Sequence, residues 1–209
     1  YADLLLADAP GEVWPVWNEL RLELNVGQYL DLWGTARADR DRDLARRISR
    51  YKSGKYTIER PLHVGAAFAG RFADLREPLS AYGDPLGEAF QLRDDMLGAF
   101  GDPDRTGKPV GQDLREGKPT PLLAIAVERV NGSDDPDGAA SLLDLVGAPS
   151  LADADVAAIQ RVLVDTGAVG EIERTIDSLA QRAIEAIEAA DVTAEARDEL
   201  VDLARFVAF

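Results

Sequence analysis

The spacing of the apolar residues constrains the fold of this chain more than any other feature. Between residues 172 and 187, apolar side chains recur every three or four positions, at Ile172, Ile176, Leu179, Ala183 and Ile187. This spacing places them along one side of an α-helix. No stretch of comparable length alternates apolar and polar residues with the period of two that a half-buried strand requires. The pattern therefore predicts an all-α fold.

The same period predicts further helices over residues 12–35, 40–53, 58–75, 86–100, 120–130, 139–145, 151–165 and 194–207. Turn-forming segments separate several of them, at residues 10–11, 101–109 and 131–138. Ser150 and Asp153 have the spacing of a capping box, which predicts a helix start at residue 151. The chain shows no repeat of fixed period and no long linker, so residues 1–209 are predicted to form a single domain, a helical bundle.

Composition narrows the classes of function. The chain has 23 Lys and Arg against 38 Asp and Glu, a net charge of −15, and no basic stripe that would bind a nucleic-acid backbone. Its apolar runs are far shorter than the roughly 20 residues of a membrane-spanning helix. No signal-peptide pattern opens the chain, so we expect a cytoplasmic protein. Because Cys is absent and His63 is the only His, a metal ion would need oxygen ligands, which favours Mg²⁺ or Ca²⁺.

The densest group of chemically active side chains lies at residues 91–95. On a helix, Gln91 lies one turn before Asp94 and Asp95, so an amide and two carboxylates project into one sector. Neighbouring carboxylates repel each other, and a divalent cation shared with an anionic substrate would relieve that repulsion. The same pattern is also compatible with a solvated acidic turn of a helix.

Lysine is scarce, and Lys52, Lys108 and Lys118 flank the acidic helix in predicted loops or at helix ends. An ammonium group suits a phosphate, which Mg²⁺ can bridge to carboxylates of the same sign. The local field rather than the net charge decides whether such a ligand binds. Together these residues predict a site for a phosphorylated ligand, although each lysine taken singly is compatible with ordinary surface charge.

Two further residue types have structural interpretations. His63 has no partner His or Cys, so a catalytic role would depend on its residue type alone, and we interpret it as structural. Trp14, Trp17 and Trp33 lie on apolar helical faces, which predicts packing or subunit-interface contacts.

Four segments, in this order, resemble motifs of the trans-isoprenyl diphosphate synthases, the polyprenyl synthetase family. They are GQYLDL at 27–32, YKSGKYT at 51–57, FQLRDDML at 90–97, and the loop that follows, with GD at 101–102, TGK at 106–108, DL at 113–114 and GK at 117–118. The amino-acid sequence at 56–61 and 87–95 is most similar to that of actinobacterial geranylgeranyl diphosphate synthases. The resemblance implies an isoprenoid-synthase-type helical bundle. It also implies a Mg²⁺-dependent prenyltransferase that condenses an allylic diphosphate with isopentenyl diphosphate into a longer trans-polyprenyl diphosphate, such as geranylgeranyl diphosphate.

The resemblance also implies residue roles. Asp94 and Asp95 would hold the Mg²⁺ that binds the allylic diphosphate. Contacts to that diphosphate, or the shape of its closed pocket, would come from Lys52, Gln91, Lys108 and Lys118, with Ser53 where the family usually has Thr. Gln28 and Asp31 are weaker candidates, which would contact these side chains rather than the diphosphate itself. The tunnel for the growing chain would be lined or neighboured by Phe90, Ala66, Ala67 and Ala69, for which core packing is the alternative.

The sequence departs from the family pattern in two ways. The motif usually reads Asp-Asp-x-x-Asp, and Gly98 stands at its last position, which we interpret as a modified site. The family's first aspartate-rich motif, which supplies the other Mg²⁺ ligands, does not occur. The chain resembles roughly the C-terminal two-thirds of such an enzyme, so we expect that N-terminal helices are missing and that activity needs them.

Two functions are compatible with these residues. The first is the prenyltransferase, a homodimer as family members usually are. The second is a non-catalytic helical partner that regulates a full-length synthase by dimerising with it. The product length, the preferred primer and the pathway served are left open by the sequence.

Overall fold

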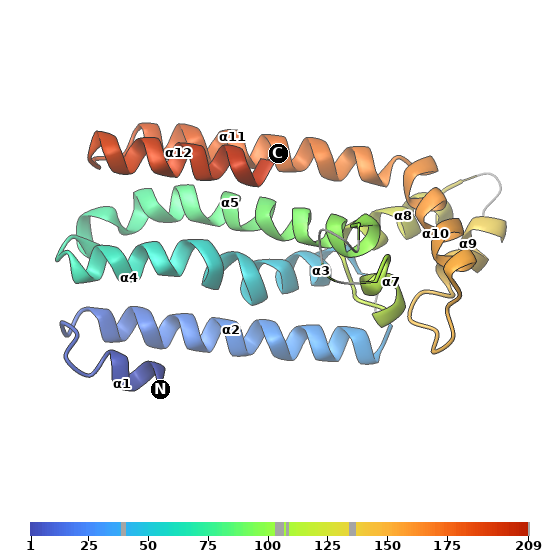
Figure 1. Cartoon of the computed structure of the whole chain (residues 1–209), viewed down its shortest axis with the longest axis horizontal. Helices are drawn as coiled ribbons and strands as arrows, with labels where there is room; N and C mark the ends of the chain where they lie inside the picture. Colours follow the sequence, from blue (N-terminus) through green and yellow to red (C-terminus); the bar gives the residue numbers. More distant parts are fainter. Residues whose placement is uncertain (39–40, 103–106, 108, 134–136, 209) are drawn as a thin grey trace.

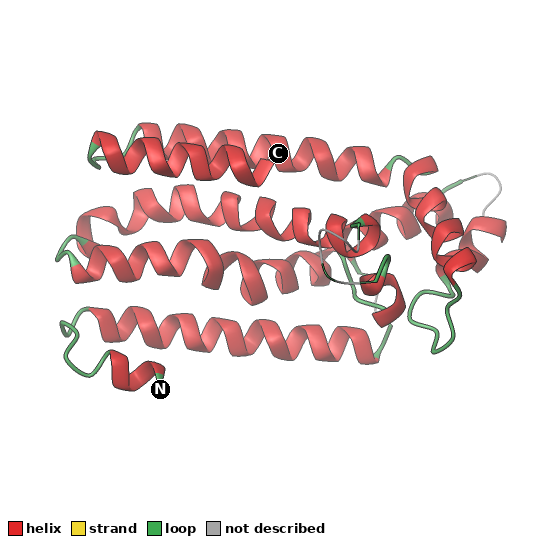
Figure 2. Ribbon diagram, viewed as in Figure 1, coloured by secondary structure: helices red, strands yellow, loops and turns green. Residues whose placement is uncertain are grey.

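The structure is a computed structural model that describes residues 1–38, 41–102, 107, 109–133 and 137–208. Within these ranges every regular element is a helix, as Figure 2 shows, which confirms the all-α prediction. The elements are α1 (Ala2–Leu5), α2 (Val13–Ala36), α3 (Arg42–Ser49), the π-helix η1 (Arg50–Glu59), α4 (Arg60–Phe68), α5 (Phe72–Phe100), α7 (Gln112–Glu116), α8 (Pro121–Asn131), α9 (Asp137–Leu143), α10 (Asp153–Asp165), α11 (Ala168–Glu188) and α12 (Ala194–Ala208).

The long helices form layers along the length of the molecule. Figure 1 shows α2 on one side, then the continuous run of α3, η1 and α4, then α5, and finally the antiparallel pair α11 and α12. The short helices α7 to α10 gather at one end. Within this arrangement α5 packs against both η1 and α11, and η1 also packs against α2. The π-helix is therefore enclosed between α2 and α5.

The apolar stripe of α11 confirms the prediction made from its spacing. Ile172, Ile176, Leu179, Ala183 and Ile187 are all buried, at 0–6% exposure, in a core shared with α5 and α12. On the facing side, Tyr82 of α5 is fully buried, and its hydroxyl donates to the Leu200 carbonyl of α12 at 2.7 Å. The amphipathic pattern thus joins α5, α11 and α12 into one core.

Several predicted boundaries are wrong. The break expected at 54–57 is bridged by η1, which leads directly into α4. The helices expected at 58–75 and 86–100 are instead broken at 69–71, and α5 then continues from Phe72 to Phe100 through Pro78 and Pro85. Burial of α5 between η1 and α11 offsets the backbone hydrogen bonds that the two prolines remove. The expected capping box is also displaced. Helix α10 begins at Asp153, and the Ala152 N–H donates to Asp155 Oδ2 at 3.1 Å.

A buried ionic cluster joins α2, η1 and α4. We use this name for Glu23, Lys55, Glu59 and Arg60 together with Glu19, which lies at the rim with its side chain 39% exposed. The Arg60 guanidinium donates to Glu23 at 2.7 and 2.8 Å and to Glu19 at 2.9 Å, and Lys55 Nζ lies 2.6 Å from Glu59 Oε2. Buried charges are tolerated when they are paired in this way.

His63 lies against this cluster and is fully buried. Its Nδ1 lies 2.9 Å from Arg60 Nη1, its Nε2 lies 3.1 Å from the Arg76 carbonyl, and its ring meets Phe72 edge-on. Burial is the main cause that lowers the pKa of His63, so the neutral imidazole is favoured. This environment matches its interpretation as a structural residue.

The tryptophans divide between packing and exposure. Trp14 and Trp17 are half-buried, and Trp17 Nε1 donates to Asp3 Oδ1 at 2.8 Å. Trp33 is exposed on α2, with the Arg37 guanidinium 4.4 Å from its ring centroid. None of the helices in the described part of the chain combines the length and apolar composition needed to cross a bilayer.

Candidate functional site

A polar pocket of about 80 Å³ lies where α2, α3, η1 and α5 meet the segment after α7. Its charged and amide side chains come from four separate parts of the sequence, and they are Asp31, Lys52, Gln91, Asp94, Asp95 and Lys118. Ser53 also lines the pocket. The structure therefore brings together every residue predicted to contact the diphosphate or the Mg²⁺ except Lys108, which lies outside the described residues. Gln28 is exposed and does not line the pocket.

Helix α5 presents the amide and the two carboxylates on one sector, as their spacing predicts. Gln91 Nε2 donates to Asp95 Oδ1 at 2.8 Å and approaches Asp94 Oδ2 at 3.5 Å. Asp94 is exposed, whereas Asp95 is only 6% exposed. Burial, and then the nearby Asp113 and Asp94 charges, raise the pKa of Asp95 to about 8, against the lowering effect of the Gln91 hydrogen bond and of Lys118. A cation bound here would displace a proton from Asp95.

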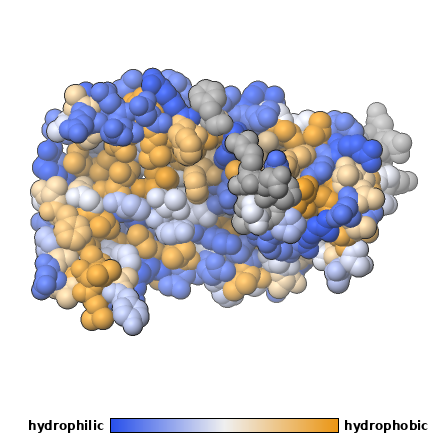
Figure 3. All heavy atoms as spheres, viewed as in Figure 1, coloured by the Kyte–Doolittle hydropathy of each residue, from blue (hydrophilic) through white to orange (hydrophobic). Residues whose placement is uncertain are grey.

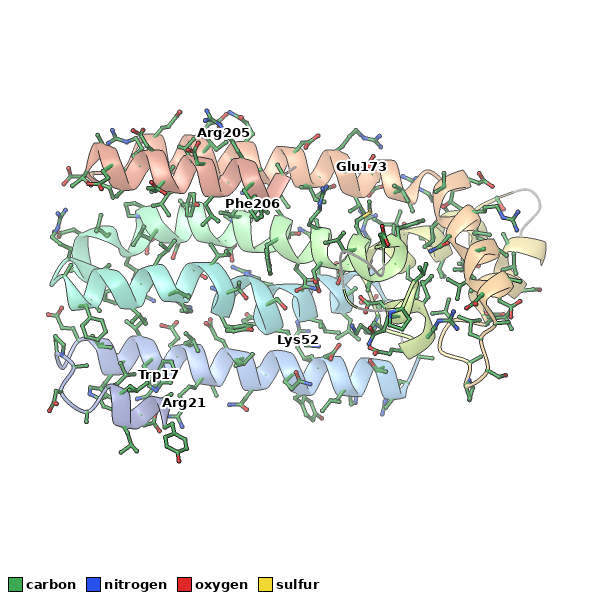
Figure 4. All side chains as sticks on the ribbon, in the orientation of Figure 1. Trp17, Arg21, Lys52, Glu173, Arg205 and Phe206 are labelled. Atoms are coloured by element: carbon green, nitrogen blue, oxygen red, sulfur yellow. The ribbon has the colours of Figure 1, made fainter. Side chains whose placement is uncertain are left out.

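The π-helix η1 supplies Lys52 and Ser53 to the pocket. Lys52 Nζ lies 2.6 Å from Asp31 Oδ2 on α2, and Figure 4 shows Lys52 on the side of η1 that faces α2. Two glycines allow η1 to pack closely on its neighbours, Gly27 of α2 and Gly87 of α5. A Cβ at Gly27 would lie 2.3 Å from the Lys52 backbone nitrogen, and one at Gly87 would lie 2.5 Å from the Gly54 carbonyl oxygen.

Lys118 enters the pocket from the segment after α7. Its ammonium forms a short ion pair with Asp113 and lies 3.4 Å from Glu116 Oε2. Burial disfavours the charge on Lys118, but the Asp113 hydrogen bond and the attraction of Asp113 and Glu116 outweigh burial and raise its pKa. Lys118 is therefore a fixed positive charge opposite the α5 carboxylates.

Asp113 is the contact that sequence reasoning missed. It stands within a recognised motif, but no role was predicted for it, because its neighbour in space is Gly98, fifteen positions earlier in the chain. The pairing of Asp31 with Lys52 was also not predicted, because the two residues belong to separate motifs. In each case a signal existed, a glycine in an acidic motif or the single acid of the GQYLDL motif, but only the fold shows the partner.

The donor set fits a hard divalent cation. In the described ranges no three His, Cys, Asp or Glu side chains are placed to enclose an ion by themselves. Asp94 and Asp95 nonetheless offer carboxylate oxygens beside the lysines of the pocket. Mg²⁺ is commonly held by one or two carboxylates, with phosphate and water completing its coordination. The pocket has the composition that this mode requires.

An apolar groove of about 640 Å³ adjoins the polar pocket. Its walls are mainly apolar, with Phe90, Met96, Leu97 and Phe100 of α5 and Phe206 and Val207 of α12, and Arg93 and Asp102 also line it. Asp94 lines both the polar pocket and this groove. Figure 4 shows Phe206 between α12 and α5, and hydrophobic residues are visible over this region in Figure 3.

Phe90 thus lines the groove, but the three alanines that were also expected beside the tunnel do not. Ala66 and Ala67 are buried in the core, and Ala69 follows the end of α4 on the surface. None of them lines the groove, because their segment lies toward the other end of α5. Core packing, the alternative considered from sequence, explains the two buried alanines.

The layered helices and the pocket of acids and lysines define an α-helical protein with the isoprenoid synthase fold. The model of the family described as polyprenyl synthetase matches residues 3–163. The chain belongs to the polyprenyl synthetase family. Its relatives therefore include trans-isoprenyl diphosphate synthases.

Three relatives illustrate the match. The geranylfarnesyl diphosphate synthase of Aeropyrum pernix is 33% identical over 168 residues, which cover 80% of this chain and 50% of the relative. The (2E,6E)-farnesyl diphosphate synthase of Mycobacterium tuberculosis is 36% identical over 162 residues, 77% of this chain and 45% of the relative. The crystal structure of geranylgeranyl pyrophosphate synthase from Corynebacterium glutamicum, complexed with isoprenyl diphosphate and magnesium, has a TM-score of 0.89 and 38% identity. That match covers 94% of this chain and 55% of the neighbour. The chain spans about half the length of these curated relatives.

Proposed function

We propose that residues 1–209 form one all-helical prenyltransferase domain of a trans-polyprenyl diphosphate synthase. This domain binds the allylic diphosphate substrate. The reaction is the condensation of that diphosphate with isopentenyl diphosphate, with geranylgeranyl diphosphate as the expected product and Mg²⁺ as the cation. The convergence of Lys52, Gln91, Asp94, Asp95 and Lys118 on one pocket carries this proposal. The M. tuberculosis and A. pernix relatives make products of different length, so the family alone does not fix the product.

Each charged or amide side chain of the polar pocket has its own proposed role in this reaction. Mg²⁺ held by Asp94 and Asp95 would neutralise the charge that develops on the departing pyrophosphate. Lys52 and Lys118 would donate to the diphosphate oxygens, and Gln91 would hold the carboxylates in place through its hydrogen bond to Asp95. As the allylic carbon–oxygen bond breaks, the alkene of isopentenyl diphosphate attacks the allylic carbon, and the departing pyrophosphate then takes up the proton that the new chain loses.

The apolar groove supports the same assignment. Because Asp94 lines both cavities, a ligand with its diphosphate in the polar pocket would have its hydrocarbon chain directed along Phe90 and Phe206. An apolar wall also excludes water from the reactive carbon. We further propose that activity requires a region outside this sequence, since the family's first aspartate-rich motif does not occur in it.

Asp94→Asn is expected to weaken Mg²⁺-dependent binding of pyrophosphate by at least about tenfold, since it removes an exposed carboxylate charge from the pocket. Isothermal titration calorimetry, with and without Mg²⁺, measures the change. Lys108→Ala is expected to weaken binding as well. The matched control is Glu173→Gln, an exposed acid on α11 (Figure 4), for which we expect the affinity of the unaltered chain. Equal affinity of Asp94→Asn and Glu173→Gln would refute the proposed function.

We also propose that the protein acts in the cytoplasm as a homodimer. Four apolar residues, Leu22, Val26, Tyr29 and Trp33, follow the helical period along one face of α2 and are 36–66% exposed. A helix face of this kind normally packs against another surface. Sedimentation equilibrium at micromolar concentration is expected to give twice the chain mass, and a monomer mass would contradict the dimer.

A further inference from the structure

Gly98 of α5 and Asp113 of α7 approach each other more closely than any larger residue at position 98 would permit. A Cβ at residue 98 would lie 2.1 Å from Asp113 Oδ2 and 2.4 Å from its Cγ. Residue 98 follows Asp94 by four positions and Asp95 by three, so it lies on the same side of α5. The Asp113 carboxylate therefore occupies the space where a side chain of the acidic motif would begin.

The backbone around Asp113 holds its carboxylate at this place. The flanking glycines, Gly111 and Gly117, both adopt the left-handed conformation, with φ of 67° and 69°. Gly117 also packs directly on Gly147, where an added Cβ would lie 2.9 Å from the Gly147 Cα. After this turn the Lys118 N–H donates to the Asp113 carbonyl at 3.1 Å. The local fold thus brings Asp113 and Lys118 together.

The Asp113 and Lys118 side chains form an ion pair at the pocket wall. Asp113 is only 5% exposed, and a carboxylate so buried requires a paired charge. Its ion-pair partner is the Lys118 ammonium, which itself lines the pocket. Glu116 is a second acceptor for the same ammonium, at 3.4 Å, and its side chain is 45% exposed. Asp113 and Glu116 therefore compete for Lys118, one inside the fold and the other toward solvent.

We propose that Asp113 is a positioning residue, whose carboxylate is placed on Gly98 and holds the Lys118 ammonium inside the diphosphate pocket. Asp113 acts through Lys118 and is not itself assigned as a cation ligand. Without the Asp113 charge, Lys118 would move toward Glu116 and solvent. The position of Lys118 does not depend on the nature of the ligand, whereas the consequence for diphosphate binding rests on the proposed function.

The position of Lys118 is tested without any ligand. We expect Asp113→Asn, which keeps the shape of the side chain and removes its charge, to raise the rate at which an amine-acylating reagent modifies Lys118 by about fivefold or more. The reason is that a charged hydrogen bond protects the ammonium. Mass spectrometry of peptides gives the rate at each lysine. Lys52, which is paired with Asp31, is the internal control and should keep its rate. An unchanged rate at Lys118 overturns the proposal.

A second variant tests the same proposal if Asp113→Asn does not fold. Gly98→Ala keeps both charges but places a methyl group where the carboxylate lies, so Lys118 is again expected to react faster. Glu116→Gln is the matched control, because it weakens the longer and more exposed contact of Lys118 and leaves the Asp113 carboxylate in place. Similar acylation of Lys118 in Gly98→Ala and in the unaltered chain would also overturn the proposal.

The consequence for the pocket is tested by pyrophosphate binding in the presence of Mg²⁺. We expect Asp113→Ala to lose about tenfold in affinity, and the double variant Gly98→Asp with Asp113→Ala to regain most of it, because the carboxylate then returns from α5. A merely structural role for Asp113 would not be rescued in this way. If the unaltered chain binds no pyrophosphate, the proposed function fails while the acylation result still decides the role of Asp113. If the chain binds pyrophosphate and Asp113→Ala binds equally well, the positioning role fails alone.

Discussion

Gly87→Val is expected to lower the unfolding free energy by about 3 kcal/mol or more and to abolish pyrophosphate binding. The crossing of α5 with η1 leaves no room for a side chain, since a Cβ at Gly87 would lie 2.5–2.7 Å from three backbone atoms of Gly54. Backbone atoms cannot rotate away as a flexible side chain can, so the two helices would have to separate. Urea denaturation followed by circular dichroism measures the change.

The chain provides a matched control for this variant. Gly65 lies in α4, and an added Cβ there would meet nothing within 4 Å. Gly65→Ala is therefore expected to leave the free energy unchanged or to raise it by up to about 1 kcal/mol through helix propensity. Loss of binding in Gly87→Val would follow from displacement of Lys52 and Ser53, which lie within two residues of Gly54. If Gly87→Val and Gly65→Ala were equally stable, the close packing of η1 on α5 would be wrong.

Arg60→Met is expected to lower the unfolding free energy at neutral pH by about 3–5 kcal/mol. Arg60 is 3% exposed, and its removal leaves the Glu23 and Glu59 carboxylates, which are 15% and 4% exposed, with less positive charge. Arg205→Met is the control, because Arg205 pairs with Asp202 on the exposed face of α12, where both side chains are more than half exposed (Figure 4). Its effect should stay within about 0.5 kcal/mol. Equal losses for the two variants would contradict the role of the cluster.

The loss in Arg60→Met should also depend on pH. Burial opposes the charge of Glu59, but hydrogen bonds from Lys55 and Ser80 and the charges of Lys55 and Arg60 outweigh burial and lower its pKa. A lowered pKa contributes stability above the unfolded value and loses it on acidification through the folded value. The difference between the unaltered chain and Arg60→Met should therefore be largest near neutral pH and shrink in acid. Urea denaturation of the two proteins, once near neutral pH and once in acid, measures this difference.

Periodic apolar spacing predicted most of the fold, because burial decides which face of each helix turns inward. The stripe of α11 shows this directly, with every predicted residue buried. The continuation of α5 through Pro78 and Pro85 was not predictable in the same way. Local rules count the hydrogen bonds that a proline removes, but they do not count the burial of Tyr82 and Leu86, which lie on either side of Pro85.

The site was predictable to the extent that its residues share a motif. Gln91, Asp94 and Asp95 lie together because a helix repeats every three to four residues. The pairing of Lys52 with Asp31, and of Lys118 with Asp113, depends on the packing of separate helices and on a tight turn between glycines. Sequence spacing shows that such charges exist, and the three-dimensional arrangement shows which of them are partners.

The π-helix η1 also constrains which genetic changes the chain can accept. Its ten residues carry Lys52 and Ser53 to the pocket at one end and Lys55 and Glu59 to the buried ionic cluster at the other. Deletion or insertion of one residue between these ends would turn the two groups relative to each other by about 100° if the segment relaxed to an α-helix. Only one group could then keep its place. Changes in the length of η1 should therefore be rare among functional descendants of this sequence.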